Sequence, residues 1–347
     1  MSHFTVCIIG DNPEEQLAPF QENNMGDCPQ EYLEFENMEP EYREKYMTGT
    51  IKMVRCPDGK LEHTSDAKFN VKDNPESVFS SSKFILPDGY TTVEVSFSRV
   101  YKTFSQFMKD YAGYETKDEK TGKYGLWRNP QSKWDWYSLG GRWRGYFKLK
   151  KSKVGLIGEP GVGENEPTYN ADQALKKDID FKTMRQTCAK HARDEYQTVL
   201  RLLGVGGSLQ PLQWSWKTIL ENEKFNSLTM DEKRNMYRGQ VPLKRLEELR
   251  NSESFKAMSE QEKDIFGFFF DYEDYLCSEQ EYVQRACDGA ICTHAVIKDG
   301  QWYEKGEMGW WGCVSHEMTD DDWNRKFSEL LDNLPGNTLL SIYDCHI

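Results

Sequence analysis

The segment from Trp134 to Phe147 gathers arginine, tyrosine and tryptophan side chains around the pair Gly140-Gly141. Glycine adopts the positive φ angles of a two-residue turn, so the sequence predicts a β-hairpin here. Alternation along the paired arms places four candidate binding residues on one polar face together with Asp135: Tyr137, Arg142, Arg144 and Tyr146. The opposite face is predicted to be core and carries Trp134, Trp136, Trp143 and Phe147. A guanidinium group binds phosphate or carboxylate and also stacks on rings. The polar face therefore predicts a site for a small phosphate-bearing or nucleotide-like ligand. The alternative is that these pairs only stabilise the hairpin.

A second reactive group lies at the two ends of the chain. Asp344 and His346 share one face of a predicted closing strand, because side chains alternate along a strand. If the first and last strands pair, His3 approaches His346. Two imidazoles and a carboxylate could bind a divalent metal, or Asp344 could orient an imidazole as a general base. The alternative, which we favour, is ordinary hydrogen-bonded residues at a strand end, so we predict no metal site.

Two further segments carry polar or aromatic side chains. Trp310 and Trp311 stand between glycines, and one of these rings could form the wall of a pocket, although a core position for both is the simpler interpretation. Asn23 and Asn24, in the loop after the first strand, could contact a ligand or could only cap their own backbone. For an enzyme, the candidate base is His346 or His316 and its partner Asp344 or Glu22.

Composition limits the classes of function. The formal net charge is −13 over 347 residues, which argues against a general nucleic-acid binder. No run of about 18 apolar residues occurs, so no membrane span is expected. The short apolar start lacks the basic flank of a signal peptide. The nine cysteines are odd in number and scattered, with no C-x-x-C pair, which favours a reducing cytoplasm over a disulfide framework.

Hydrophobic periodicity gives the elements that must position these residues. Alternating strands are predicted near both ends, at 3–9 and 338–346, and a long amphipathic helix is predicted at 181–203. The sequence thus predicts an α+β fold, with a mixed or antiparallel sheet built from both chain ends and a central helical insertion or subdomain. The expected parts are a β-rich part at 1–154 with an acidic arm and the hairpin, helices at 171–289, and a strand-helix-strand part at 290–347.

The chain resembles an uncharacterised family of bacteriophage and bacterial proteins. The resemblance lies in the opening Met1–Val6, the stretch Glu15–Pro29, the Trp134–Phe147 segment, Met308–Gly312 and the closing Asp344–Ile347. It implies an intracellular accessory protein encoded by a phage, and it assigns no catalytic residue or cofactor.

Three functions follow as hypotheses. The first is a cytoplasmic binding protein for a small phosphate-bearing or nucleotide-like ligand, with counter-defence as the role that a phage origin suggests. The second is a hydrolase or transferase that converts such a ligand. The third is an inhibitor whose acidic arm, from Glu14 to Glu44, engages a host protein. Of the three we favour the binding protein.

Overall fold

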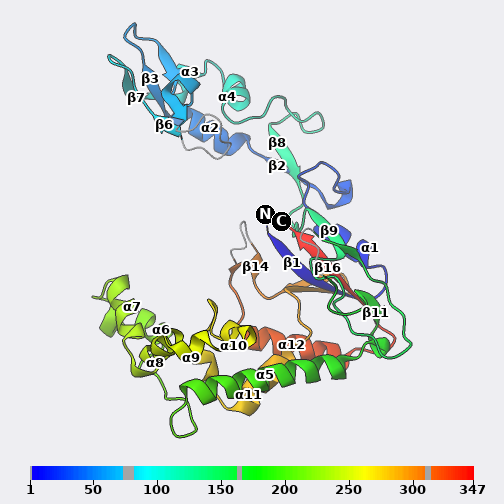
Figure 1. Cartoon of the computed structure of the whole chain (residues 1–347). Coiled ribbons are helices and arrows are strands. Elements are labelled where there is room, and N and C mark those ends of the chain that lie inside the picture. Colours follow the sequence, from blue (N-terminus) through cyan, green and yellow to red (C-terminus); the bar gives the residue numbers. More distant parts are fainter. Residues whose placement is uncertain (1, 73–81, 162–165, 309–313) are drawn as a thin grey trace. The chain divides into compact units, whose positions relative to one another are not determined.

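The computed structural model describes residues 2–72, 82–161, 166–308 and 314–347. The chain forms two compact units. We call Met1–Pro19 with Lys133–Ile347 the terminal unit, because it contains both chain ends, and Phe20–Ser132 the middle unit. Figure 1 labels the elements of both. This division differs from the predicted parts, since the helices at 171–289 belong to the same unit as the sheet.

The terminal unit contains a mixed sheet in which the two chain ends are neighbours. Its strands run in the order β10-β9-β16-β1-β12-β13, and β11 also pairs with β16. Strand β1 is antiparallel to β16 and parallel to β12. The strands are β1 (His3–Ile9), β9 (Trp136–Gly141), β10 (Glu159–Pro160), β11 (Gln173–Leu175), β12 (Ala295–Lys298), β13 (Gln301–Glu304) and β16 (Leu339–His346), with a separate pair β14 (Glu307–Met308) and β15 (Val314–Ser315).

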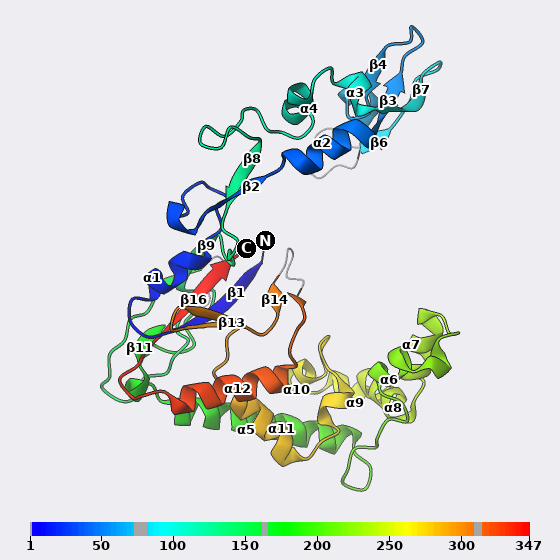
Figure 2. The same cartoon turned by 180° about the vertical axis from the view of Figure 1, so that it is seen from behind.

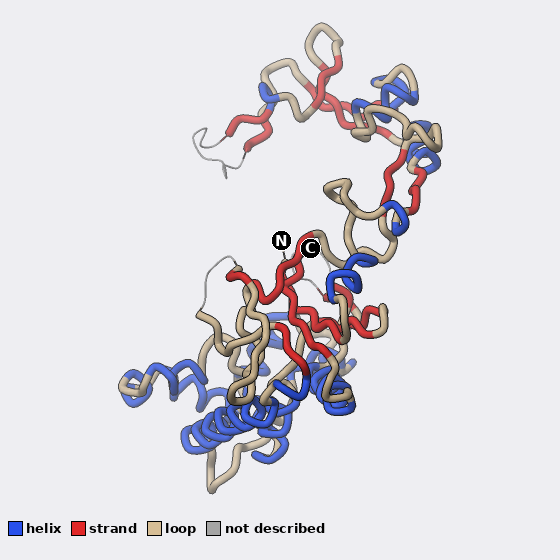
Figure 3. The backbone as a smooth tube through the Cα atoms, turned by 90° about the vertical axis from the view of Figure 1, so that its right-hand side faces the viewer, coloured by secondary structure: helices blue, strands red, loops and turns tan. Residues whose placement is uncertain are grey.

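The helices of the terminal unit gather beside this sheet, as the blue tubes of Figure 3 show. Helix α11 packs against both α5 and α12, and Figure 2 shows the three together. The helices are α1 (Pro13–Leu17), α5 (Phe181–Leu203), α6 (Trp216–Glu221), α7 (Met230–Arg238), α8 (Val241–Arg250), α9 (Glu253–Lys256), α10 (Glu260–Ile265), α11 (Glu279–Asp288) and α12 (Asp320–Asn333). The predicted α+β class, with a sheet from both chain ends and a central helical region, is confirmed.

One face of the sheet forms the main core. Cys7 and Ile9 of β1 and Leu340 and Ile342 of β16 are buried in one cluster with α12, which contributes Trp323, Phe327 and Leu331. Side chains alternate along a strand, so the same two rows continue through Thr5 and His3 on β1 and through Asp344 and His346 on β16. The polar residues at the chain ends therefore extend a hydrophobic face.

The middle unit is built from short strands and aromatic side chains. Strand β3 pairs with β4 and β7, and the buried cluster beside them holds Phe97, Tyr101, Phe107, Met108 and Tyr124. The elements are β2 (Glu34–Asn37), α2 (Glu39–Thr48), β3 (Thr50–Arg55), β4 (Leu61–His63), β5 (Asn70–Lys72), β6 (Ser82–Phe84), β7 (Thr91–Ser96), α3 (Phe97–Val100), α4 (Phe104–Asp110) and β8 (Gly125–Arg128).

The predicted β-hairpin over Trp134–Phe147 is wrong. Only its first arm is a strand, β9, which pairs with β16 and with β10 instead of with the second arm. Gly140 and Gly141 do have positive φ angles, of 73° and 51°. The chain nevertheless leaves this corner without folding back, and Phe147 forms a bridge with Ala171. The glycines serve a different purpose, described below.

Candidate functional site

The two histidines at the chain ends lie directly opposite each other. In the register of β1 and β16, His3 faces His346. The neighbouring pair, Ser2 and Ile347, exchanges both backbone hydrogen bonds at 3.1 Å. His3 and His346 are consequently a pair without mutual backbone bonds, the type whose side chains approach most closely. Their ring centroids are 4.9 Å apart, with the rings edge to face.

A buried carboxylate holds the first ring. His3 Nδ1 lies 2.8 Å from Asp344 Oδ1, across the diagonal of the strand pair. The other oxygen of Asp344 accepts the backbone N–H of Arg142 at 3.0 Å. Asp344 is fully buried, and its carboxylate accepts from both partners, so the ring and the Gly-Gly corner are fixed to each other.

A second carboxylate holds the second ring in the same way. His346 Nδ1 lies 2.6 Å from Asp135 Oδ1. The backbone N–H of Asp135 donates to the carbonyl of His346 at 2.9 Å, which places this aspartate beside the ring just before β9 begins. Trp136 follows, 46% exposed, and its indole meets both histidine rings edge to face at 5.8 and 6.4 Å. We call His3–Asp344 and His346–Asp135 the paired dyads.

The paired dyads leave the same atom of each ring available. A carboxylate accepts, so each Nδ1 carries the proton, and Nε2 of the neutral ring carries the lone pair. Within the described chain, neither Nε2 has a hydrogen-bond partner, and each side chain keeps 12% of its surface exposed. This is the arrangement of an oriented general base, present twice.

The contacts of both Nδ1 atoms with carboxylates fit a metal ligand at Nε2 as well as a general base. No group of three or more His, Cys, Asp and Glu side chains is placed to hold a metal ion in the described ranges.

The Gly-Gly corner makes room for two buried carboxylates. A Cβ at Gly141 would lie 2.4 Å from Asp344 Cβ and Oδ2, and one at Gly140 would lie 2.5 Å from Asp172 Oδ2. Asp172 accepts the backbone N–H groups of Tyr146 and Gly158 at 2.9 and 2.8 Å. Burial raises the pKa of Asp172, and these hydrogen bonds oppose the rise. The Gly-Gly corner thus fixes the position of Asp344, the carboxylate of the first dyad.

The four residues predicted to share a polar face are dispersed. Tyr137 packs edge to face on Tyr343. Arg144 Nε donates to the carbonyl of Gly158 at 2.8 Å, and the Tyr146 hydroxyl donates to the carbonyl of Cys292 at 2.6 Å. Arg142 alone combines an exposed side chain with a link to the paired dyads, through its backbone bond to Asp344.

The other predicted residues lie outside this site. Asn23 belongs to the middle unit, where its amide donates to the carbonyl of Trp127 at 2.8 Å; Asn24 and Glu22 belong to the same unit. His316 is exposed between β15 and α12, with φ at +51°. Trp310 and Trp311 lie outside the described residues.

Sequence reasoning found His3, Asp344 and His346 but missed two partners. Asp135 was placed beside Arg142 and Arg144 on a hairpin face, and Trp136 was assigned to the core. Both errors follow from the prediction that the two halves of Trp134–Phe147 pair with each other as a hairpin. The sequence did contain a signal for the correct pairing. Residues 136–141 form a strand-like run of their own, and the closing strand of eight residues can accept a partner strand on each of its two sides.

The comparisons with protein-family models, curated proteins and solved structures found no match. Across the residues that the structure describes, no helix has the length and apolar character needed to cross a membrane.

Proposed function

We propose that the paired dyads are an acid–base centre that cleaves a phosphate ester in a nucleotide-like substrate. The observation that carries the proposal is the pair of imidazoles, each oriented by its own carboxylate at 2.8 and 2.6 Å, with both Nε2 atoms available. One oriented imidazole could be structural, but two that face each other can supply both a general base and a general acid.

The reaction needs opposite proton transfers on the two rings. The neutral ring takes a proton at Nε2 from a water molecule or hydroxyl, whose oxygen then bonds to phosphorus. The second ring, protonated, gives its Nε2 proton to the leaving oxygen as the old P–O bond breaks. Asp344 and Asp135 stabilise whichever ring is positively charged. The rings exchange protonation states in the step, and proton exchange with water restores them.

Two neighbouring side chains support a phosphate-bearing, ring-containing substrate. Arg142 is exposed and has no ion pair within the described residues, so its guanidinium is available to an anion. Trp136 exposes almost half of its surface beside both histidine rings, and an indole face stacks on a nucleobase. Of the predicted arginines and tyrosines only Arg142 is kept as a proposed binding group, and Trp136 is added.

The test is product formation by the full chain. Wild-type protein and the His3→Gln/His346→Gln variant, purified alike, are incubated with linear nucleotides, cyclic nucleotides and dinucleotides, and phosphorus NMR detects cleavage. The proposal expects a new phosphate product with the wild type only. Binding of a nucleotide without any product would favour a binding protein, and equal turnover by both proteins would overturn the proposal.

A further inference from the structure

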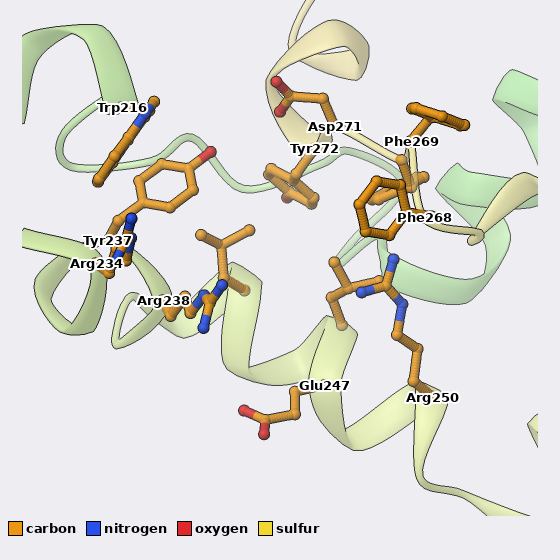
Figure 4. Close-up of a pocket in the computed structure, with 13 residues that line it drawn as sticks. Trp216, Arg234, Tyr237, Arg238, Glu247, Arg250, Phe268, Phe269, Asp271 and Tyr272 are labelled. Carbon is orange, nitrogen blue, oxygen red and sulfur yellow. The ribbon is translucent and has the colours of Figure 1, made fainter. Parts of the chain in front are cut away.

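A second candidate site lies in the helical part of the terminal unit, among the short helices after α5. A cavity of about 670 Å³ opens there between α6, α7, α8 and the segment before Tyr272. Figure 4 shows Trp216, Tyr237 and Arg238 on one side and Phe268 and Phe269 on the other. Leu243 and Leu246 also line it. Aromatic and arginine side chains are the residues that dominate protein–protein contacts.

The cavity walls are fixed in place. The carboxylate of Glu273 accepts the Tyr237 hydroxyl at 2.8 Å and the backbone N–H of Trp216 at 2.7 Å. The Tyr272 hydroxyl donates to the carbonyl of Gln210 at 2.9 Å. A surface that is ordered before binding loses less entropy when a partner arrives.

The rim exposes two adjacent phenylalanines. Phe268 and Phe269 are 95% and 93% exposed, whereas Phe270 stacks on Tyr275 inside the unit. The two exposed rings are perpendicular, with centroids 5.2 Å apart. Each ring presents on the order of 200 Å² of surface, so covering both rings and the cavity requires more surface than a small ligand has. The occupant that fits is a segment of protein.

The charge of the cavity selects among such segments. Arg238 is exposed and, within the described residues, forms no ion pair or side-chain hydrogen bond. By contrast, Arg234 pairs with Asp231 at 3.1 Å, and Arg250 donates to the carbonyl of Phe266 at 2.8 Å. Two acids also line the cavity: Asp271 accepts the backbone N–H of Glu273 at 2.9 Å, and Glu247 is exposed and forms no ion pair within the described residues. The lining thus holds three arginines against two carboxylates, and this excess of positive charge beside apolar walls favours a partner carboxylate flanked by apolar side chains.

We propose that this cavity binds an acidic amphipathic helix of another protein. Apolar side chains of the helix cover Phe268 and Phe269 and enter the cavity beside Leu243. A carboxylate of the helix pairs with Arg238. The site is independent of the paired dyads, so variants of His3 and His346 bind the segment normally.

The test uses two labelled helix-forming peptides of about four turns, with leucines spaced three and four residues apart and either glutamates or lysines between them. Fluorescence anisotropy with the full chain should show binding of the glutamate peptide. We expect Phe268→Ala/Phe269→Ala and Arg238→Glu each to weaken binding about tenfold or more, because such anchors dominate interfaces. Arg238→Glu should also shift the preference toward the lysine peptide.

Matched controls and contrary outcomes complete the experiment. Arg55→Glu and Met25→Ala/Met47→Ala remove an exposed charge and two exposed apolar side chains from the middle unit, and they should leave binding unchanged. Thermal melts should be unaltered, because the replaced residues are exposed. Equal binding of both peptides by the wild type, or full binding by the two cavity variants, would overturn the proposal. So would self-association that depends on both phenylalanines.

Discussion

Substitution of Gly141 tests whether the Gly-Gly corner exists to seat Asp344. Alanine at φ +51° costs about 1–2 kcal/mol in any protein, because Cβ crowds the backbone in the left-handed region. At Gly141 the new methyl would also lie 2.4 Å from two atoms of Asp344 and 2.7 Å from Ser138 Oγ. Overpacking of this kind costs about 1–3 kcal/mol more. We therefore expect Gly141→Ala to lower the free energy of unfolding by about 2–5 kcal/mol.

Gly206 supplies the matched control. Its φ is +63°, and a Cβ there would meet no atom within 4 Å, so Gly206→Ala should cost only the backbone part, about 1–2 kcal/mol. Urea unfolding at a common m-value gives both numbers. Because the two glycines share the terminal unit, the difference isolates the contact with Asp344. Equal losses for both variants would refute the reasoning and leave the corner a simple turn.

Three further predictions follow from the same geometry. Asp344→Asn should lose about 1–3 kcal/mol in urea unfolding. An amide whose oxygen accepts the Arg142 N–H turns its NH2 toward His3 Nδ1, and the ring must then move its proton to Nε2; the opposite orientation sets the NH2 against the Arg142 N–H. Burial lowers the pKa of His294, so the unfolded chain takes up the proton first; stability should be complete above about pH 6.5 and fall as the pH drops below it. His294→Gln should make that decline shallower, and an unchanged slope would contradict it. Trp136→Ala should raise KM for a nucleotide about 5- to 150-fold with little change in kcat, because stacking contributes about 1–3 kcal/mol per base.

Local patterns predicted the elements that contain the site. The strand at 3–9 and the helix at 181–203 have the predicted bounds. The strand is rich in β-branched residues, and the helix has an amphipathic period. Both chain ends in one sheet were also predicted, and from that pairing the approach of His3 to His346, which the register confirms.

The strand that pairs with residues 136–141 was not predictable from the local sequence. The run at Trp134–Phe147 has the alternation of a hairpin, but Gly140 and Gly141 lie against the buried carboxylates of Asp172 and Asp344. The local sequence does not indicate that these two aspartates, which are distant in sequence, pack against the Gly-Gly pair. For the same reason Asp135 was grouped with the arginines instead of with His346, because the order of the strands in the sheet decides which carboxylate lies beside which histidine.

The most direct test of the paired dyads is a double-mutant cycle on turnover of whichever phosphate ester the wild type cleaves. We expect His3→Gln and His346→Gln each to lower kcat by about 10²–10⁴-fold, and the double variant to lose little more, because the two rings act in one proton-transfer step. His316→Gln, which replaces an exposed histidine outside the dyads, should retain full activity. Full activity in either dyad variant, or loss of activity in the His316 variant, would contradict the account.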